Sequence, residues 1–313
     1  MTRFETPRVA VVGAGEVGRG WAALAVAAGW PVTIYDADSD KLAPAADAVA
    51  DRVVHLVQLR RAQAPVAEEA LNVMRVGRSL LNAVADADWI IEAVPDDLAV
   101  KQKALQLCEQ VARRAAILTS SSASLGPSLL GARLDRPERF IVTHPLAPVD
   151  LIPLVEVVPG PKTDAEVIED IRFWLSMMGR AAIVFKKEII GNIAQRLRAA
   201  VWRECIQLVL DGVLDVEDVD RAVSVGPALA WAATGPHLDH QLGSGELGVD
   251  VVLPRMLGEY EEIWKSLADW KQLPTEDQNR LVKLLDKAYA QHLPELREAR
   301  DLRVARLLEA LRE

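Results

Sequence analysis

A histidine and a glutamate in two nearby apolar segments are the residues of this chain best suited to acid–base chemistry. His144 ends the apolar run 140–143, and Glu156 lies within the apolar run 154–158. Because an unpaired carboxylate in an apolar strand is costly, we expect Glu156 to pair with His144. The carboxylate would then orient the imidazole, and the other ring nitrogen could take the proton of a substrate hydroxyl. The pattern predicts a catalytic pair; a merely structural histidine is the alternative.

A glycine-rich turn near the start of the sequence is typical of phosphate binding. Residues 13–18 read Gly-Ala-Gly-Glu-Val-Gly, between the apolar run 9–12 and a segment with apolar residues at helical spacing. The glycines allow a tight turn, close approach of a pyrophosphate and close packing of helix on strand, while the helix N–H groups face the phosphate. Asp36 ends the next apolar run, where it can accept from both ribose hydroxyls and would repel a 2′-phosphate. This order of elements predicts NAD binding. The residues expected to contact NAD here are Gly13, Gly15, Glu16, Val17, Gly18 and Asp36.

The elements that position these residues alternate between strands and helices up to about residue 186. Strands are expected at 9–12, 32–35, 73–76, 88–95, 115–119, 140–143, 154–158 and 181–185. Such alternation predicts an α/β fold with a Rossmann-type doubly wound, mostly parallel sheet. Beyond this point the pattern is almost entirely helical, and the first helix is expected over residues 189–210. We therefore expect an NAD-binding Rossmann domain over residues 1–186 and an all-helical substrate and dimerisation domain over residues 187–313.

The composition of the chain limits the classes of molecule that it can bind. The 313 residues are 50% hydrophobic and 26% charged, with a formal net charge of −9. This charge argues against binding to nucleic acid or to an anionic membrane surface. No apolar run reaches membrane-spanning length, and the first residues lack the apolar core of a signal peptide. With two cysteines in apolar stretches, the sequence indicates a cytoplasmic protein. His237 and His240 have no third ligand cluster nearby, so no metal site is expected.

Several blocks of the sequence resemble the 3-hydroxyacyl-CoA dehydrogenase family. They are GAGEVGRGW, IIEAVPDDLAVKQK, ILTSSSASLGPS, THPLAPVDLIPLVEVV and KKEIIGNIAQRL, and the resemblance runs from Arg8 to the C-terminus. It is closest to the branch that contains L-gulonate 3-dehydrogenase (lambda-crystallin) and L-carnitine dehydrogenase. The resemblance implies a Rossmann domain, a helical domain that forms homodimers, and reversible NAD-dependent oxidation of a β-hydroxyl. It also implies that His144 and Glu156 are the catalytic pair.

The resemblance extends the cofactor site to the block after the fourth strand. It assigns Ala93, Val94, Asp96 and Lys101 to this site. For Lys101, a solvated surface lysine is the alternative.

Four departures from the family pattern affect the substrate pocket. Ala123 stands where the family places a serine that touches the reacting oxygen, although a shift of one residue would make Ser122 the hydroxyl. Ala147 replaces an asparagine. Gln195, which we expect in the catalytic site together with Ser122, replaces another asparagine with an amide one methylene longer. Ala230, beside Trp231, replaces an arginine that could clamp a carboxylate.

These departures exchange polar groups for methyl groups, so we expect a secondary alcohol or ketone less anionic than usual for the family. The alternative is that Arg196 or Arg198 supplies the lost charge. Three functional classes stay open: an NAD-dependent alcohol dehydrogenase, an NAD-binding crystallin-like protein of little activity, and NAD-dependent chemistry at a C=N bond. Retention of His144 and Glu156 favours the dehydrogenase.

Overall fold

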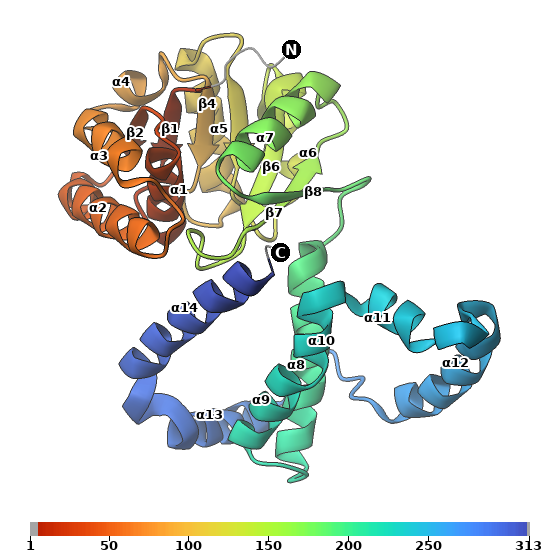
Figure 1. Cartoon of the computed structure of the whole chain (residues 1–313). Helices are drawn as coiled ribbons and strands as arrows, with labels where there is room; N and C mark the ends of the chain where they lie inside the picture. Colours follow the sequence, from red (N-terminus) through yellow and green to blue (C-terminus); the bar gives the residue numbers. More distant parts are fainter. Residues whose placement is uncertain (1–5, 312–313) are drawn as a thin grey trace. The chain divides into compact units, whose positions relative to one another are not determined.

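The computed structural model describes residues 6–311, and the chain divides into two compact units, Met1–Ile193 and Ala194–Glu313 (Figure 1). The first unit contains an eight-stranded sheet with the strand order β3-β2-β1-β4-β5-β6-β7-β8. Its strands are β1 (Val9–Val12), β2 (Val32–Tyr35), β3 (Arg75–Val76), β4 (Trp89–Glu92), β5 (Ile117–Ser120), β6 (Phe140–Pro145), β7 (Leu154–Pro159) and β8 (Ala181–Val184). Neighbouring strands are parallel except β6 and β7, which are antiparallel. The predicted Rossmann-type sheet followed by a helical region is confirmed.

Helices cover both faces of this sheet. They are α1 (Glu16–Ala27), α2 (Leu42–Gln58), α3 (Ala64–Val73), α4 (Leu80–Val84), α5 (Leu98–Val111), α6 (Pro127–Leu130) and α7 (Ala165–Met177). One core cluster joins α1, α2, α3 and α7 to the sheet, and a second joins α4, α5 and α6. The four residues of β1 are all buried because alternate side chains enter the two cores, which explains the unbroken apolar run in the sequence.

Several predicted boundaries differ from the structure, two of them for a clear reason. The strand expected over 73–76 is shorter, because α3 continues to Val73 and only Arg75 and Val76 pair with β2. The first helix after the sheet begins at Asn192 rather than Ile189. Gly191 and Asn192 have φ angles of 79° and 50°, and this left-handed backbone keeps the helix from beginning at residue 189.

The second unit is helical. Its helices are α8 (Asn192–Leu210, which begins in the first unit), α9 (Val216–Val225), α10 (Pro227–Thr234), α11 (Pro236–Gly243), α12 (Val249–Ser266), α13 (Thr275–Tyr289) and α14 (Leu293–Ala310). Two small buried clusters hold α8, α9 and α13 together. Many apolar side chains remain exposed, including Trp202 at 60% and Trp264 at 54%. Within residues 6–311, no helix is both long and apolar enough to cross a membrane.

Tryptophans form a buried cluster on one face of the sheet. Trp89 of β4 stacks on Trp174 of α7 with ring centroids 5.5 Å apart. Trp21 and Trp30 pack edge-on against Trp89 at 5.8 and 6.5 Å. The indole N–H of Trp21 donates to Ser121 Oγ at 3.0 Å, so α1 is tied to the segment that follows β5.

Candidate active site

The glycine-rich turn between β1 and α1 has the shape that a pyrophosphate requires. Gly13 has a φ angle of 113°, and a Cβ there would lie 2.4 Å from the Ala93 carbonyl oxygen. A Cβ on Gly18 would lie 1.8 Å from the Gly13 oxygen, whereas one on the exposed Gly15 would meet nothing within 4 Å. Helix α1 begins at Glu16, and its N-cap residue, Gly15, has no side chain that could cap the first N–H groups. The turn is therefore closed on the protein side and open on the side where a phosphate would bind.

Asp36 lies at the end of β2 and is held against this turn. Its Oδ2 accepts from the Ala14 N–H at 2.8 Å, and its Oδ1 accepts from the Asp38 N–H at 2.9 Å. The carboxylate is thus fixed beside the turn, as a ribose-binding acid should be. Turn and acid together fit NAD.

His144 and Glu156 lie opposite each other in the antiparallel pair β6–β7. His144 Nδ1 is 2.8 Å from Glu156 Oε2, so the predicted pairing is present. Glu156 Oε1 accepts from the Ile193 N–H at 2.8 Å. Because an ionised carboxylate only accepts hydrogen bonds, Nδ1 is the donor and Nε2 is left as an acceptor. The Glu156 side chain is 1% exposed and that of His144 is 10% exposed, so the imidazole is the member of the pair that solvent reaches.

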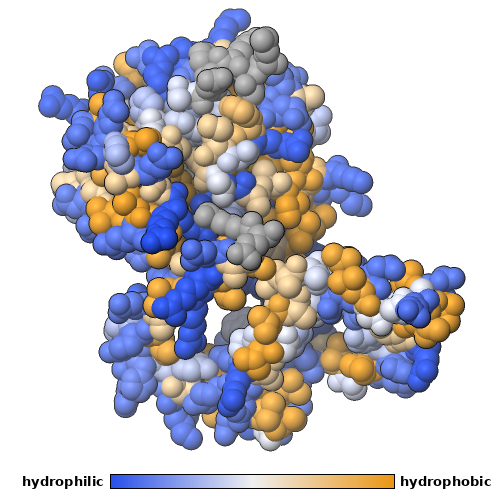
Figure 2. Space-filling view, viewed as in Figure 1, coloured by the Kyte–Doolittle hydropathy of each residue, from blue (hydrophilic) through white to orange (hydrophobic). Residues whose placement is uncertain are grey.

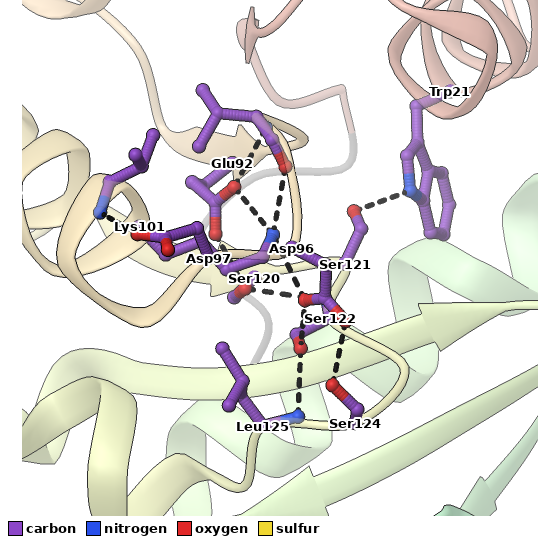
Figure 3. A network of polar contacts seen from close by, with 12 residues as sticks. Trp21, Glu92, Asp96, Asp97, Lys101, Ser120, Ser121, Ser122, Ser124 and Leu125 are labelled. Atoms are coloured by element: carbon purple, nitrogen blue, oxygen red, sulfur yellow. Dashed lines mark hydrogen bonds and ion pairs between the residues drawn. The ribbon is translucent and has the colours of Figure 1, made fainter.

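Glu92, at the end of β4, is a buried acid that the sequence analysis missed (Figure 3). Its Oε1 accepts from Lys101 Nζ at 2.9 Å and from the Val94 N–H at 2.8 Å. Its Oε2 accepts from Ser120 Oγ at 2.5 Å. Burial raises the pKa of Glu92, against the lowering effect of the Lys101 charge and of these hydrogen bonds. A glutamate ending the apolar run 89–91 was a usable signal, by the same reasoning that identified Glu156.

Lys101 is the buried partner of this acid, so the solvated-surface alternative was wrong. Its side chain is only 2% exposed. Besides Glu92, Nζ contacts the Val94 carbonyl oxygen at 3.1 Å and Asp96 Oδ1 at 3.8 Å. These contacts fix the chain between β4 and α5, which includes Ala93 and packs against Gly13. Lys101 therefore shapes the cofactor turn from within the protein.

Asp96 is held by the two serines that flank Ala123 (Figure 3). Ser122 Oγ and Ser124 Oγ donate to its carboxylate at 2.6 and 2.7 Å. Burial alone would raise the pKa of Asp96, but these hydroxyls and the charge of Lys101 lower it. Ser122 Oγ also accepts from the Leu125 N–H at 3.0 Å, so the hydroxyl expected near the reacting oxygen is already engaged within this loop.

The remaining predicted residues differ in where they lie. Ala123 is half-buried between the two serines, and Ala147 is exposed in the connection between β6 and β7. Gln195 on α8, with Ala230 and Trp231 on α10, belongs to the helical unit, in which all three are exposed. Trp231 is 39% exposed within the helical unit, and its place in the substrate pocket stays a prediction.

Comparison with known proteins places this geometry in a family. The model of the 3-hydroxyacyl-CoA dehydrogenase NAD-binding domain matches residues 8–189, and that of the C-terminal domain of the same family matches residues 191–283. An L-carnitine dehydrogenase of Bacillus cereus is 34% identical over 90% of this chain and 85% of its own length.

Solved structures agree at the level of the fold. A dehydrogenase described as an NAD+-dependent dismutase superposes with a TM-score of 0.82 at 23% identity, over 98% of this chain and 99% of its own. A diketoreductase gives a TM-score of 0.66 at 29% identity, over 71% of this chain and 78% of its own. The family models and the open glycine turn lead to one conclusion: the chain belongs to the 3-hydroxyacyl-CoA dehydrogenase family and is an NAD-dependent oxidoreductase.

Proposed function

We propose that this protein interconverts a secondary, β-type hydroxyl and a ketone, with His144 as the general base and Glu156 as the group that orients it. The observation that carries the proposal is the buried Nδ1–Oε2 contact of 2.8 Å, which leaves Nε2 as the free acceptor. NAD, when bound, supplies the hydride acceptor for the substrate carbon. Ser122 and Gln195, the other predicted catalytic residues, take no proton in this scheme.

The His144–Glu156 pair accounts for proton movement in both directions. In oxidation, Nε2 takes the hydroxyl proton and the Glu156 carboxylate stabilises the resulting imidazolium. In reduction, the imidazolium returns the proton to the carbonyl oxygen. The Ile193 N–H bond to Oε1 keeps the carboxylate from rotating, so the ring orientation is retained through both steps.

We propose a substrate less anionic than is usual for the family. Ser122 and Ser124 donate to Asp96, so the hydroxyls beside Ala123 are committed to the protein. Ala147 and Ala230 add methyl groups in place of an amide and a guanidinium. L-carnitine, named for several relatives, belongs among the candidates because its trimethylammonium group offsets its carboxylate.

We also propose that the protein is a cytoplasmic homodimer. An apolar groove of about 770 Å³ lies between α8 and α13, lined by Trp202, Ile206, Leu281 and Leu285 among others. Figure 2 shows further apolar surface over the segment from α10 to α12. Apolar surface of this extent is typical of subunit interfaces. Both cysteines are free, as expected in a reducing compartment.

The experiment is a substrate panel with NAD, read by the absorbance of the reduced nicotinamide. One arm holds anionic β-hydroxy acids, one holds L-carnitine, and one holds neutral secondary alcohols. Turnover in the second or third arm that His144→Ala abolishes supports the proposal. Turnover confined to the anionic arm would overturn the substrate assignment. Turnover that survives His144→Ala would overturn the role of His144. Silence in all arms with NAD still bound would favour the weakly active or C=N alternatives.

A further inference from the structure

Arg52, on α2, forms ion pairs with two carboxylates of the sheet unit, one at the glycine-rich turn and one in the connection between β6 and β7. Its Nη1 donates to Asp150 Oδ1 at 2.6 Å, and its Nη2 donates to the carboxylate of Glu16. Asp150 is buried, the Arg52 side chain is 20% exposed, and Glu16 is exposed. One guanidinium thus bridges two carboxylates that lie far apart in the sequence.

The first of these carboxylates lies in the cofactor turn. Glu16 is the first residue of α1, and the N–H groups at this end of the helix are those expected to hold the pyrophosphate. A carboxylate at a helix N-terminus is itself favoured by the helix dipole, so it competes with a phosphate for the same place. The contact with Arg52 offsets the Glu16 charge and draws that side chain toward α2.

The second carboxylate lies in the connection between β6 and β7, the strands that carry His144 and Glu156. Asp150 belongs to residues 146–153, the connection that follows β6 directly and therefore begins two residues after His144. The same connection packs on α1, since a Cβ on Gly20 would lie 2.6 Å from the Val149 Cβ. Arg180 Nη1 also donates to two carbonyl oxygens of this connection, that of Val149 at 3.4 Å and that of Asp150 at 3.3 Å. Arg52 adds to these contacts an attachment through the Asp150 side chain.

We propose that Arg52 is a positioning residue with two separable effects. Through Glu16 it keeps the helix N-terminus available to the phosphates of NAD, and through Asp150 it holds the connection that follows His144. The expected loss of turnover rests on the proposed function. The expected effects on NAD binding and on the rigidity of the connection do not.

The test separates the two carboxylates by substitution. NADH affinity is measured by fluorescence titration. The rigidity of residues 146–153 is measured by hydrogen exchange of the protein without ligand. The turnover number kcat is measured with the substrate found in the panel. Arg52→Met should weaken NADH binding about fivefold, speed exchange of the connection and lower kcat about tenfold. Glu16→Gln in that background should restore the affinity, while exchange stays fast and kcat stays low. Asp150→Asn alone should speed exchange and lower kcat with little change in affinity.

The matched control is Arg172→Met, which removes the surface ion pair of Arg172 with Glu169 on α7. It should leave all three readouts unchanged. The proposal is overturned if Arg52→Met behaves like this control, or if Glu16→Gln fails to restore NADH affinity. If no substrate turns over, the affinity and exchange results still decide it, so its failure is distinguishable from failure of the proposed function.

Discussion

Two buried glutamates of the sheet unit have similar surroundings but partners of different chemistry. Glu92 and Glu156 are both nearly inaccessible, and each accepts from a cationic or protonatable side chain and from a backbone N–H. The partner of Glu92 is a lysine whose ammonium contacts Glu92, Val94 and Asp96 within the protein. The partner of Glu156 is a histidine that retains an unused ring nitrogen. A buried carboxylate can thus support proton transfer only if its partner keeps an atom free for the substrate.

The largest expected effect is on turnover at the Glu156 pair. Glu156→Gln should lower kcat about 10³- to 10⁴-fold, because an amide can donate to Nδ1 and so favours the tautomer that cannot take a proton at Nε2. NADH affinity measured by fluorescence titration serves as the control and should be retained. A kcat within tenfold of that of the parent protein would mean that Glu156 is structural, like Glu92.

At the Glu92 pair, we expect an effect on stability instead. Glu92→Gln or Lys101→Met should each lower the free energy of unfolding by about 3 kcal/mol, because either change leaves one charge buried without its partner. The double variant should lose clearly less than the sum. Urea unfolding of the four proteins measures this, with Lys103→Met, an exposed lysine of the same helix, as the control. Additive losses would show that the two groups are not coupled.

The smallest effect concerns Asp96, whose carboxylate lies 3.8 Å from Lys101 Nζ and accepts from Ser122 and Ser124. Because its pKa is lowered in the folded protein, its ionised form adds stability above the ordinary aspartate range, and this stability is lost as the pH falls through the lowered pKa. Ser124→Ala removes one of the hydrogen bonds that lower it, so the loss should move to higher pH, at a cost of about 1 kcal/mol near neutral pH.

Thermal unfolding between pH 3 and 6 checks the prediction for Asp96. Asp96→Asn is the control and should flatten this part of the profile. An unchanged profile in Ser124→Ala would mean that the hydroxyl does not hold the carboxylate.

The sequence specified the cofactor half of the site because each part is local. The turn from Gly13 to Gly18 and the acid at Asp36 lie within one strand–helix–strand unit, whose strand bounds were predicted correctly. The pairing of His144 with Glu156 could be predicted too, because burial of a carboxylate demands a partner.

The remainder depends on contacts that sequence spacing does not fix. Lys101 lies on a helix whose solvent-facing and core-facing sides both carry polar residues, so the pattern could not tell that its ammonium folds back onto Glu92. Ser122 looked like a free hydroxyl because its partner, Asp96, lies in the connection between β4 and α5. In the helical unit, apolar spacing predicted helices, but it did not indicate that Trp202 and Trp264 would stay exposed.

The distribution of tryptophans gives the two units separate optical signals. Trp21, Trp30, Trp89 and Trp174 are buried together in the sheet unit, whereas Trp202 and Trp264 are exposed in the helical unit. Where no partner subunit covers them, acrylamide should quench the indoles of the helical unit, while the clustered indoles continue to emit at shorter wavelength. Because the two signals come from different units, an unfolding titration that follows both reveals whether the units melt together or in sequence.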